Sequence, residues 1–166
     1  MSKTGWSVVA VALLAIYSVP SRADLIAHWS FDETGGTVAH DSAGGLHGTL
    51  SPTGASFVAG GISSNAVSIS QAANGFVNMG NVLAQGSGDF SVVAWVKLNP
   101  GDTTPNTIIV GKHESGYVNG YFLDVNQTGG GGEDNKALFY SGGLAAEGPG
   151  SQTSVNAGGW HQVVGV

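Results

Sequence analysis

The sequence contains no cysteine among its 166 residues. This absence excludes disulfide bridges, thiolate nucleophiles, iron–sulfur clusters and cysteine-based zinc sites. A chain of this length can still bury a sufficient core without covalent cross-links. We therefore expect a fold that packing and hydrogen bonds hold together, a situation that suits a protein exported from a bacterium.

Charge is also scarce, because charged residues make up 10% of the chain and the formal net charge is −6. Two of the five cations, Lys3 and Arg22, lie near the N-terminus. The rest of the chain has three lysines against all eleven acidic residues, which is a formal net charge of −8. Such a surface repels phosphate backbones and anionic lipids, so nucleic acid is not an expected partner. Neutral glycans and extracellular proteins remain compatible with it.

The longest apolar run, 8–19, is too short to cross a bilayer, which needs roughly 20 apolar residues, and Pro20 ends it. Small residues follow, up to Ala23, as at the cleavage site of exported proteins. We predict a signal peptide at 1–23 and one mature domain at 24–166. The mature domain is expected to be secreted or held at the cell surface, with no insertion into the membrane.

Helical periodicity is almost absent after the signal segment, whereas short alternating runs recur between turns rich in the 28 glycines. This pattern predicts an all-β sandwich or barrel. Both faces of the segment 90–98 are apolar, which is typical of a central strand, and 32–48 is expected to be one long polar loop. The predicted strands are 25–31, 66–70, 75–79, 90–98, 107–112, 120–125, 136–140 and a last strand that begins near 160.

Three motifs, in order, resemble the laminin-G-like domains of the concanavalin A-like lectin/glucanase superfamily. The first is Phe31-Asp32-Glu33 with the Asp41-Ser42-Ala43-Gly44 turn and His47-Gly48; the second is GDFSVVAWVK at 88–97; the third is GGWHQVVGV at 158–166. Gln162 stands where the family more often has a second histidine. The resemblance implies a two-sheet antiparallel jelly roll that recognises glycans or proteins, sometimes with one structural calcium ion.

The family continues with further turns and a hairpin after the third motif, whereas this sequence stops at Val166 inside an apolar run. An unpaired hydrophobic end of this kind favours aggregation. We therefore expect the β-sandwich to be incomplete at its C-terminus.

Candidate calcium ligands are the three carboxylates Asp32, Glu33 and Asp41, since calcium binds several hard oxygen atoms. The spacing matches no compact calcium loop, and the alternative is that Asp41 holds a side-chain turn and Asp32 caps a loop. Zinc is not expected, because the five histidines show no ligand spacing. These histidines are His28, His40, His47, His113 and His161.

A candidate sugar site combines Tyr117, Asn119, Tyr121 and Asp124, which surround the start of a predicted strand. Aromatic faces pack on sugar rings, and amide and carboxylate groups accept hydrogen bonds from sugar hydroxyl groups. The alternative is ordinary surface decoration of a strand. Trp29, Trp95 and Trp160 are also possible platforms, but their place in alternating strands favours the core.

Catalysis is not expected, because glycoside hydrolysis needs two carboxylates on one face and no alternating acidic array occurs in the sequence. The predicted function is therefore a secreted, non-catalytic recognition module that binds carbohydrate. The alternatives are an adhesion domain that binds another protein and an accessory domain of a larger secreted enzyme.

Overall fold

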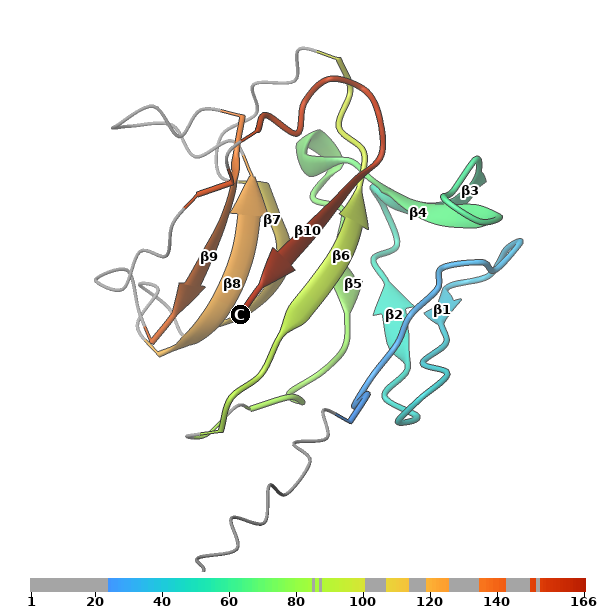
Figure 1. Ribbon diagram of the computed structural model, residues 1–166. Helices are drawn as coiled ribbons and strands as arrows, with labels where there is room; N and C mark the ends of the chain where they lie inside the picture. The colour runs from blue at the N-terminus through green and yellow to red at the C-terminus, as the bar shows by residue number, and fades with distance from the viewer. Residues whose placement is uncertain are drawn as a thin grey trace, which may run out of the picture.

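The computed structural model describes residues 24–84, 86, 88–100, 107–113, 119–125, 135–142, 150–151 and 153–166. Within these ranges every regular element is a β-strand, apart from the short 3-10 turn η1 (Gln71–Ala73). The predicted all-β class is thus confirmed, with several antiparallel sheets (Figure 1). The predicted signal peptide lies outside the described residues, and no helix within them is long and apolar enough to span a membrane.

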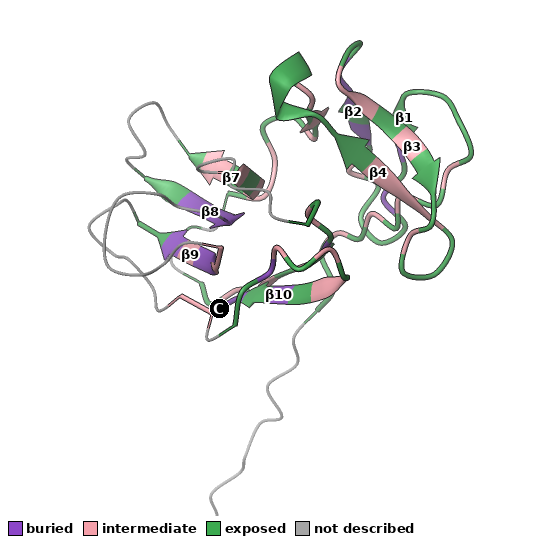
Figure 2. Cartoon of the chain, turned by 90° about the horizontal axis from the view of Figure 1, so that it is seen from above, coloured by how far each residue is buried: buried purple, intermediate pink, exposed green. Residues whose placement is uncertain are grey.

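Two sheets form the part of the molecule that carries the larger core. The antiparallel sheet β7-β8-β9 consists of β7 (Thr107–His113), β8 (Gly120–Val125) and β9 (Ala137–Ser141). A two-stranded ribbon, β6 (Val92–Val96) with β10 (His161–Gly165), lies beside this sheet in both views (Figures 1 and 2). This arrangement is compatible with the predicted β-sandwich.

Alternation along these strands explains which side chains the two sheets bury between them. Leu123 and Val125 of β8 point to the same side and lie against Val96 of β6 and Val163 of β10. Each of these four side chains is at most 5% exposed. Burying a valine or leucine contributes roughly 1.5–3 kcal/mol, so this cluster is what holds the ribbon on the sheet.

The remaining strands pair separately. β1 (Val38–Ala39), β2 (Gly48–Leu50) and β5 (Val77–Asn78) form a three-stranded sheet, and β3 (Ala55–Ala59) forms a hairpin with β4 (Asn65–Ile69). Figure 1 shows both on the opposite side of β6 from β8 and β9. These strands are short, and Ala39 and Leu50 are their buried apolar residues.

The predicted strand 25–31 is wrong. Trp29 makes only an isolated bridge with Asp41, while Leu25 and Ile26 are 71% and 61% exposed. Phe31 adopts a left-handed backbone conformation, with φ 57°, which interrupts an extended chain. The polar stretch 32–48, predicted to be one loop, contains β1 and the start of β2 instead.

Candidate functional site

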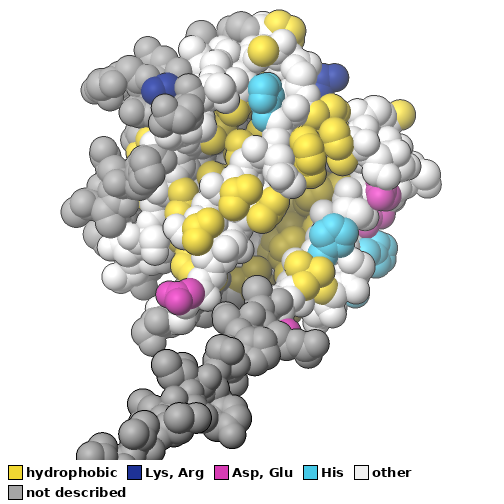
Figure 3. All heavy atoms as spheres, viewed as in Figure 1, with side chains coloured by type: hydrophobic (Ala, Val, Ile, Leu, Met, Phe, Trp, Pro, Cys, Tyr) yellow, Lys and Arg dark blue, Asp and Glu magenta, His cyan; other side chains and the backbone are white. Residues whose placement is uncertain are grey.

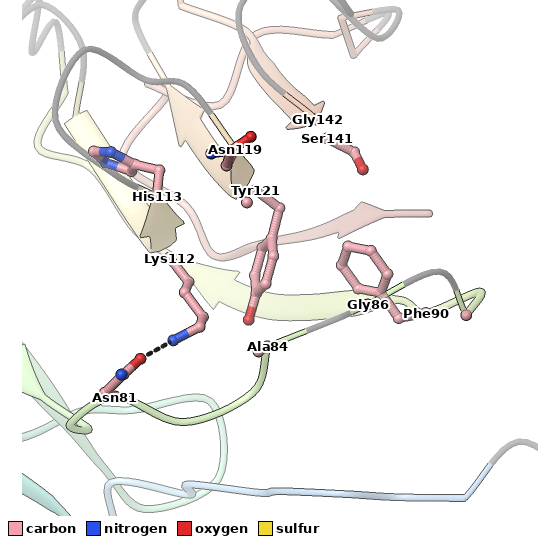
Figure 4. Close-up of a pocket in the computed structure, with 12 residues that line it drawn as sticks. Asn81, Ala84, Gly86, Phe90, Lys112, His113, Asn119, Tyr121, Ser141 and Gly142 are labelled. Carbon is pink, nitrogen blue, oxygen red and sulfur yellow. Dashed lines mark hydrogen bonds between the residues drawn. The ribbon is translucent and has the colours of Figure 1, made fainter.

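A pocket of about 610 Å³ lies at the end of the β7-β8-β9 sheet where β8 begins (Figure 4). Its volume falls within the range of small-molecule sites, roughly 300–1,000 Å³. Its described lining comes from the segment before β6, from β7, from the start of β8 and from the end of β9. The lining residues are Asn81, Ala84, Gly86, Gly88, Phe90, Lys112, His113, Asn119, Gly120, Tyr121, Ser141 and Gly142.

The turn into β8 positions the amide of Asn119 at the pocket. Asn119 and Gly120 are both left-handed, with φ 64° and 80°, a conformation that asparagine and glycine tolerate best. A Cβ atom on Gly120 would overlap the backbone carbonyl of Lys112. The Asn-Gly pair is therefore what lets the chain enter β8 this close to β7.

β7 and β8 bring Lys112 and Tyr121 to the same side of the sheet, because these two residues lie directly opposite each other in the register. Lys112 Nζ donates a hydrogen bond to Asn81 Oδ1 over 2.6 Å (Figure 4). The next residue, His113, turns to the other face, where its ring lies 5.6 Å from that of Phe122. Lys112 thus belongs to the pocket through its side chain.

Two aromatic rings form an apolar wall of the pocket. The ring centroids of Phe90 and Tyr121 are 4.9 Å apart and tilted by 54°. Tyr121 is only 4% exposed, so its ring supports Phe90 and does not present an open face. Amide and hydroxyl groups of Asn81, Asn119 and Ser141 complete the pocket, which therefore combines an apolar wall with hydrogen-bonding groups.

Of the residues predicted for the sugar site, the structure brings Asn119 and Tyr121 together. Tyr117 lies outside the described residues. Asp124 lies on the opposite face of β8, alongside Phe122, and does not line the pocket. It is 2% exposed, and no hydrogen-bond partner of its Oδ1 occurs among the described residues. Burial raises the pKa of Asp124 from 3.8 to about 7.

Sequence reasoning missed Asn81, Phe90 and Lys112. The contact between Asn81 and Lys112 spans 31 positions, a separation that no local motif reveals. The available signal was indirect, since Lys112 is one of only three lysines after the predicted signal peptide. Lys112 lies just before a predicted turn. Its place opposite Tyr121 depends on the register of β7 and β8, which the sequence does not give.

Asp41, a predicted calcium ligand, organises the loop that follows β1. Its Oδ1 accepts hydrogen bonds from the backbone N–H groups of His28 and Ala43, and its Oδ2 accepts from those of Gly44 and Leu46, all between 2.8 and 3.0 Å. Desolvation acts to raise the pKa of Asp41, but the four bonds outweigh it and lower the pKa to about 2.

Asp32 and Glu33 also have partners within the protein. Asp32 Oδ1 accepts from the backbone N–H of Asn65 at the start of β4. Glu33 Oε1 accepts from the backbone N–H and the ring Nδ1 of His40, at 2.7 and 3.1 Å. Glu33 Oε2 is buried and has no hydrogen-bond partner in the part of the chain that the structure describes.

No group of three or more potential metal ligands converges within the described residues. The bonds of Asp32 and Asp41 fit the alternative that these residues cap a loop and hold a turn. Calcium binding by Asp32, Glu33 and Asp41 stays a prediction.

The three tryptophans have different surroundings. Trp29 is partly buried and its Nε1 donates to the carbonyl of Leu46 over 2.9 Å, and Trp160 is also partly buried. Trp95, which was expected in the core, is 47% exposed. Its position in β6 alternates with the buried Val96, so its side chain lies on the outer face of the ribbon.

The outer face of the β6–β10 ribbon is apolar. Val93 and Val164 lie opposite each other across the two strands and are 55% and 52% exposed, and Trp95 lies opposite Gln162 in the same register. Figure 3 shows hydrophobic side chains gathered over these two strands. The prediction that 90–98 is a central strand of a packed sheet is therefore wrong for the described residues: β6 pairs only with β10, and its second apolar face is exposed.

Comparison with known protein families, with curated proteins and with solved structures finds no match to this chain.

Proposed function

We propose that this chain is a secreted recognition module of laminin-G-like type, a two-sheet jelly roll that binds carbohydrate in the pocket beside Asn119 and Tyr121. The observation that carries the proposal is the pairing of an apolar wall with amide groups in one pocket of about 610 Å³. Sugars offer both an apolar C–H face and hydroxyl groups, so a site that recognises them needs both kinds of contact.

The three sequence motifs support the same proposal, because the family that they resemble recognises glycans or proteins on a β-sandwich. Fold alone does not decide function, so the assignment depends on the pocket. Within this proposal the domain has no catalytic role, and one structural calcium ion near Asp41 is an additional feature that binding measurements with and without calcium will test.

The experiment is a binding measurement by calorimetry with soluble polysaccharides, comparing the protein with Asn119→Gly. Glycine keeps the left-handed backbone of this position and removes only the amide. Asn74→Gly is a matched control, since Asn74 is also left-handed, with φ 53°, and is not among the residues that line the pocket. We expect Asn119→Gly to weaken binding and Asn74→Gly to leave it unchanged; equal affinities for both variants contradict the proposal.

A second candidate function is adhesion to an extracellular protein, which the exposed apolar face of the β6–β10 ribbon favours. On an array of extracellular proteins, Trp95→Ser should then abolish binding while Asn119→Gly leaves it intact. On glycans, loss of binding in Asn119→Gly with binding retained in Trp95→Ser supports the carbohydrate proposal. In either case the domain can serve as an accessory part of a larger secreted protein.

A further inference from the structure

The charges around the pocket differ from those of the chain as a whole. After the predicted signal peptide the sequence has eleven acidic residues and three lysines. Among the described residues that line the pocket, there is one lysine, Lys112, and there is no carboxylate. The exposed Asp89 follows Gly88 in sequence but is not part of this lining. The described lining of the pocket is thus cationic, although the protein as a whole is acidic.

The ammonium group of Lys112 is held in a defined position. One of its three N–H donors goes to Asn81 Oδ1 at 2.6 Å, and the register with Tyr121 places the side chain on the pocket side of β7. Figure 4 shows it alongside the ring of Tyr121. No described residue accepts a hydrogen bond from the two other donors, which can therefore bind an acceptor of a ligand.

A ligand carboxylate matches this group better than a hydroxyl does. A hydroxyl group accepts a hydrogen bond from the ammonium group, whereas a carboxylate adds the attraction between opposite charges to the same bond. A single lysine supplies one positive charge, which balances a single carboxylate. A uronate polymer carries one carboxylate per sugar and is also repelled by the net negative charge of the protein, so the contact with Lys112 must outweigh this repulsion; a more densely charged sulfated chain is repelled more strongly.

Building on the carbohydrate function proposed above, we propose that the pocket binds a uronic acid unit of an acidic polysaccharide. The carboxylate of the sugar accepts hydrogen bonds from Lys112, and its ring lies against Phe90, which Tyr121 supports at 4.9 Å. The amides of Asn81 and Asn119 contact the hydroxyl groups.

The test uses the purified full chain and matched pairs of polysaccharides in calorimetry. The probes are polygalacturonate and alginate, each compared with its carboxyl-reduced neutral form, together with dextran and dextran sulfate. The variants are Lys112→Gln and, as a control with the same change of charge, Lys97→Gln, whose side chain is exposed and does not line the pocket.

We expect at least one uronate polymer to bind more tightly than its neutral form, and Lys112→Gln to weaken that binding by about 10-fold or more, as the loss of a charged hydrogen bond does. Lys97→Gln should change it less than about 2-fold, within the range of screened surface charges. Glutamine can still bond to Asn81, so the fold is retained, and circular dichroism verifies it.

The other outcomes separate this inference from the proposed function. Neutral polymers that bind as well as or better than the uronates overturn the inference and leave carbohydrate binding in place. Tighter binding of dextran sulfate with the same dependence on Lys112 overturns the uronate assignment. If no polysaccharide binds, among these or a wider neutral panel, the proposed function and the inference fail together.

Discussion

His28 and Asp41, thirteen positions apart, are joined by a hydrogen bond of 2.8 Å from the backbone N–H of His28 to Oδ1 of Asp41. The same carboxylate binds three N–H groups of its own loop. The segment 24–31 therefore lies against this loop through the carboxylate of Asp41, the bonds between His28 and Ser42 and the contacts of Trp29, without becoming a strand of a sheet.

Replacing Asp41 with asparagine should lower the thermal stability, because an amide can present only one acceptor oxygen to the four donors. Asp41→Ala should lower it further. Thermal unfolding followed by circular dichroism measures both, with the exposed Asp89→Asn as the control. If Asp41→Asn melts at the temperature of the control, the carboxylate does not hold this loop.

The pH dependence of Asp41 has a defined sign. Its pKa is about 2 in the folded protein and ordinarily 3.8, so the stability it contributes is fully present above about pH 4 and is lost as the pH falls towards 2. Glu33, whose pKa is also lowered by its bonds to His40, adds to the same trend. Urea unfolding between pH 5 and 2 should show a weaker dependence on pH in Asp41→Asn than in the parent protein.

Asp124 should have the opposite effect. Burial raises its pKa from 3.8 to about 7, so between these values the folded state keeps a proton that the unfolded state has lost. The free energy of unfolding then falls by up to about 1.4 kcal/mol per pH unit as the pH rises from about 4 to 7.

The variant Asp124→Asn has no titrating group at this position and should remove this loss of stability. Unfolding in urea at pH 5 and at pH 8 measures it, with Asp89→Asn again as the control. A parent protein that is as stable at pH 8 as at pH 5 would contradict the raised pKa.

The outer face of the ribbon gives a prediction that distinguishes neighbouring residues. Trp95→Ala removes a large aromatic that is 47% exposed, whereas Val96→Ala removes a smaller side chain that is 5% exposed and packed in the core. We expect Trp95→Ala to change the free energy of unfolding by about 0.5 kcal/mol or less, and Val96→Ala to cost about 1–3 kcal/mol. A larger loss for Trp95→Ala would mean that this side chain is buried in solution.

The predicted strand ranges overlap β4 to β10 and miss β1, β2 and β3. The predicted range 120–125 coincides with β8, and 107–112 differs from β7 by one residue. β1 and β2 have only two and three residues, too few to show a period. The segment 25–31 alternates well, but alternation shows only that a strand is possible. Whether the segment joins a sheet depends on a neighbouring strand with which it can pair. Here the side chain of Asp41 accepts the backbone N–H of His28 instead.

The candidate site was predictable only where it follows a single strand. Asn119 and Tyr121 were found because both lie at the start of β8. Asp124 was predicted to belong to the same site as these two residues. It lies three positions after Tyr121, and side chains an odd number of positions apart in a strand point to opposite faces of the sheet. Lys112 and Asn81 meet through the register of β7 and through the tertiary fold, neither of which is visible in a local pattern.

Gly48, the glycine of the His-Gly motif, offers a last prediction about why a particular residue type is required. It is buried in β2, and a Cβ atom there would overlap Sδ of Met79 and lie 2.9 Å from Cγ1 of Val77. Gly48→Ala should therefore cost about 1–3 kcal/mol of unfolding free energy, as overpacking does. Gly35→Ala is the control, because nothing lies within 4 Å of a Cβ atom at that position.

The double variant Gly48→Ala with Met79→Ala separates this crowding from other effects of the new methyl group. Removing the side chain of Met79 makes room for the Cβ atom of residue 48. The cost of Gly48→Ala should then be smaller in the Met79→Ala background than in the parent protein, a coupling of roughly 0.5 kcal/mol or more. Additive costs in urea unfolding would mean that Met79 does not restrict this position, and the glycine would then need another explanation, such as the approach of Val77.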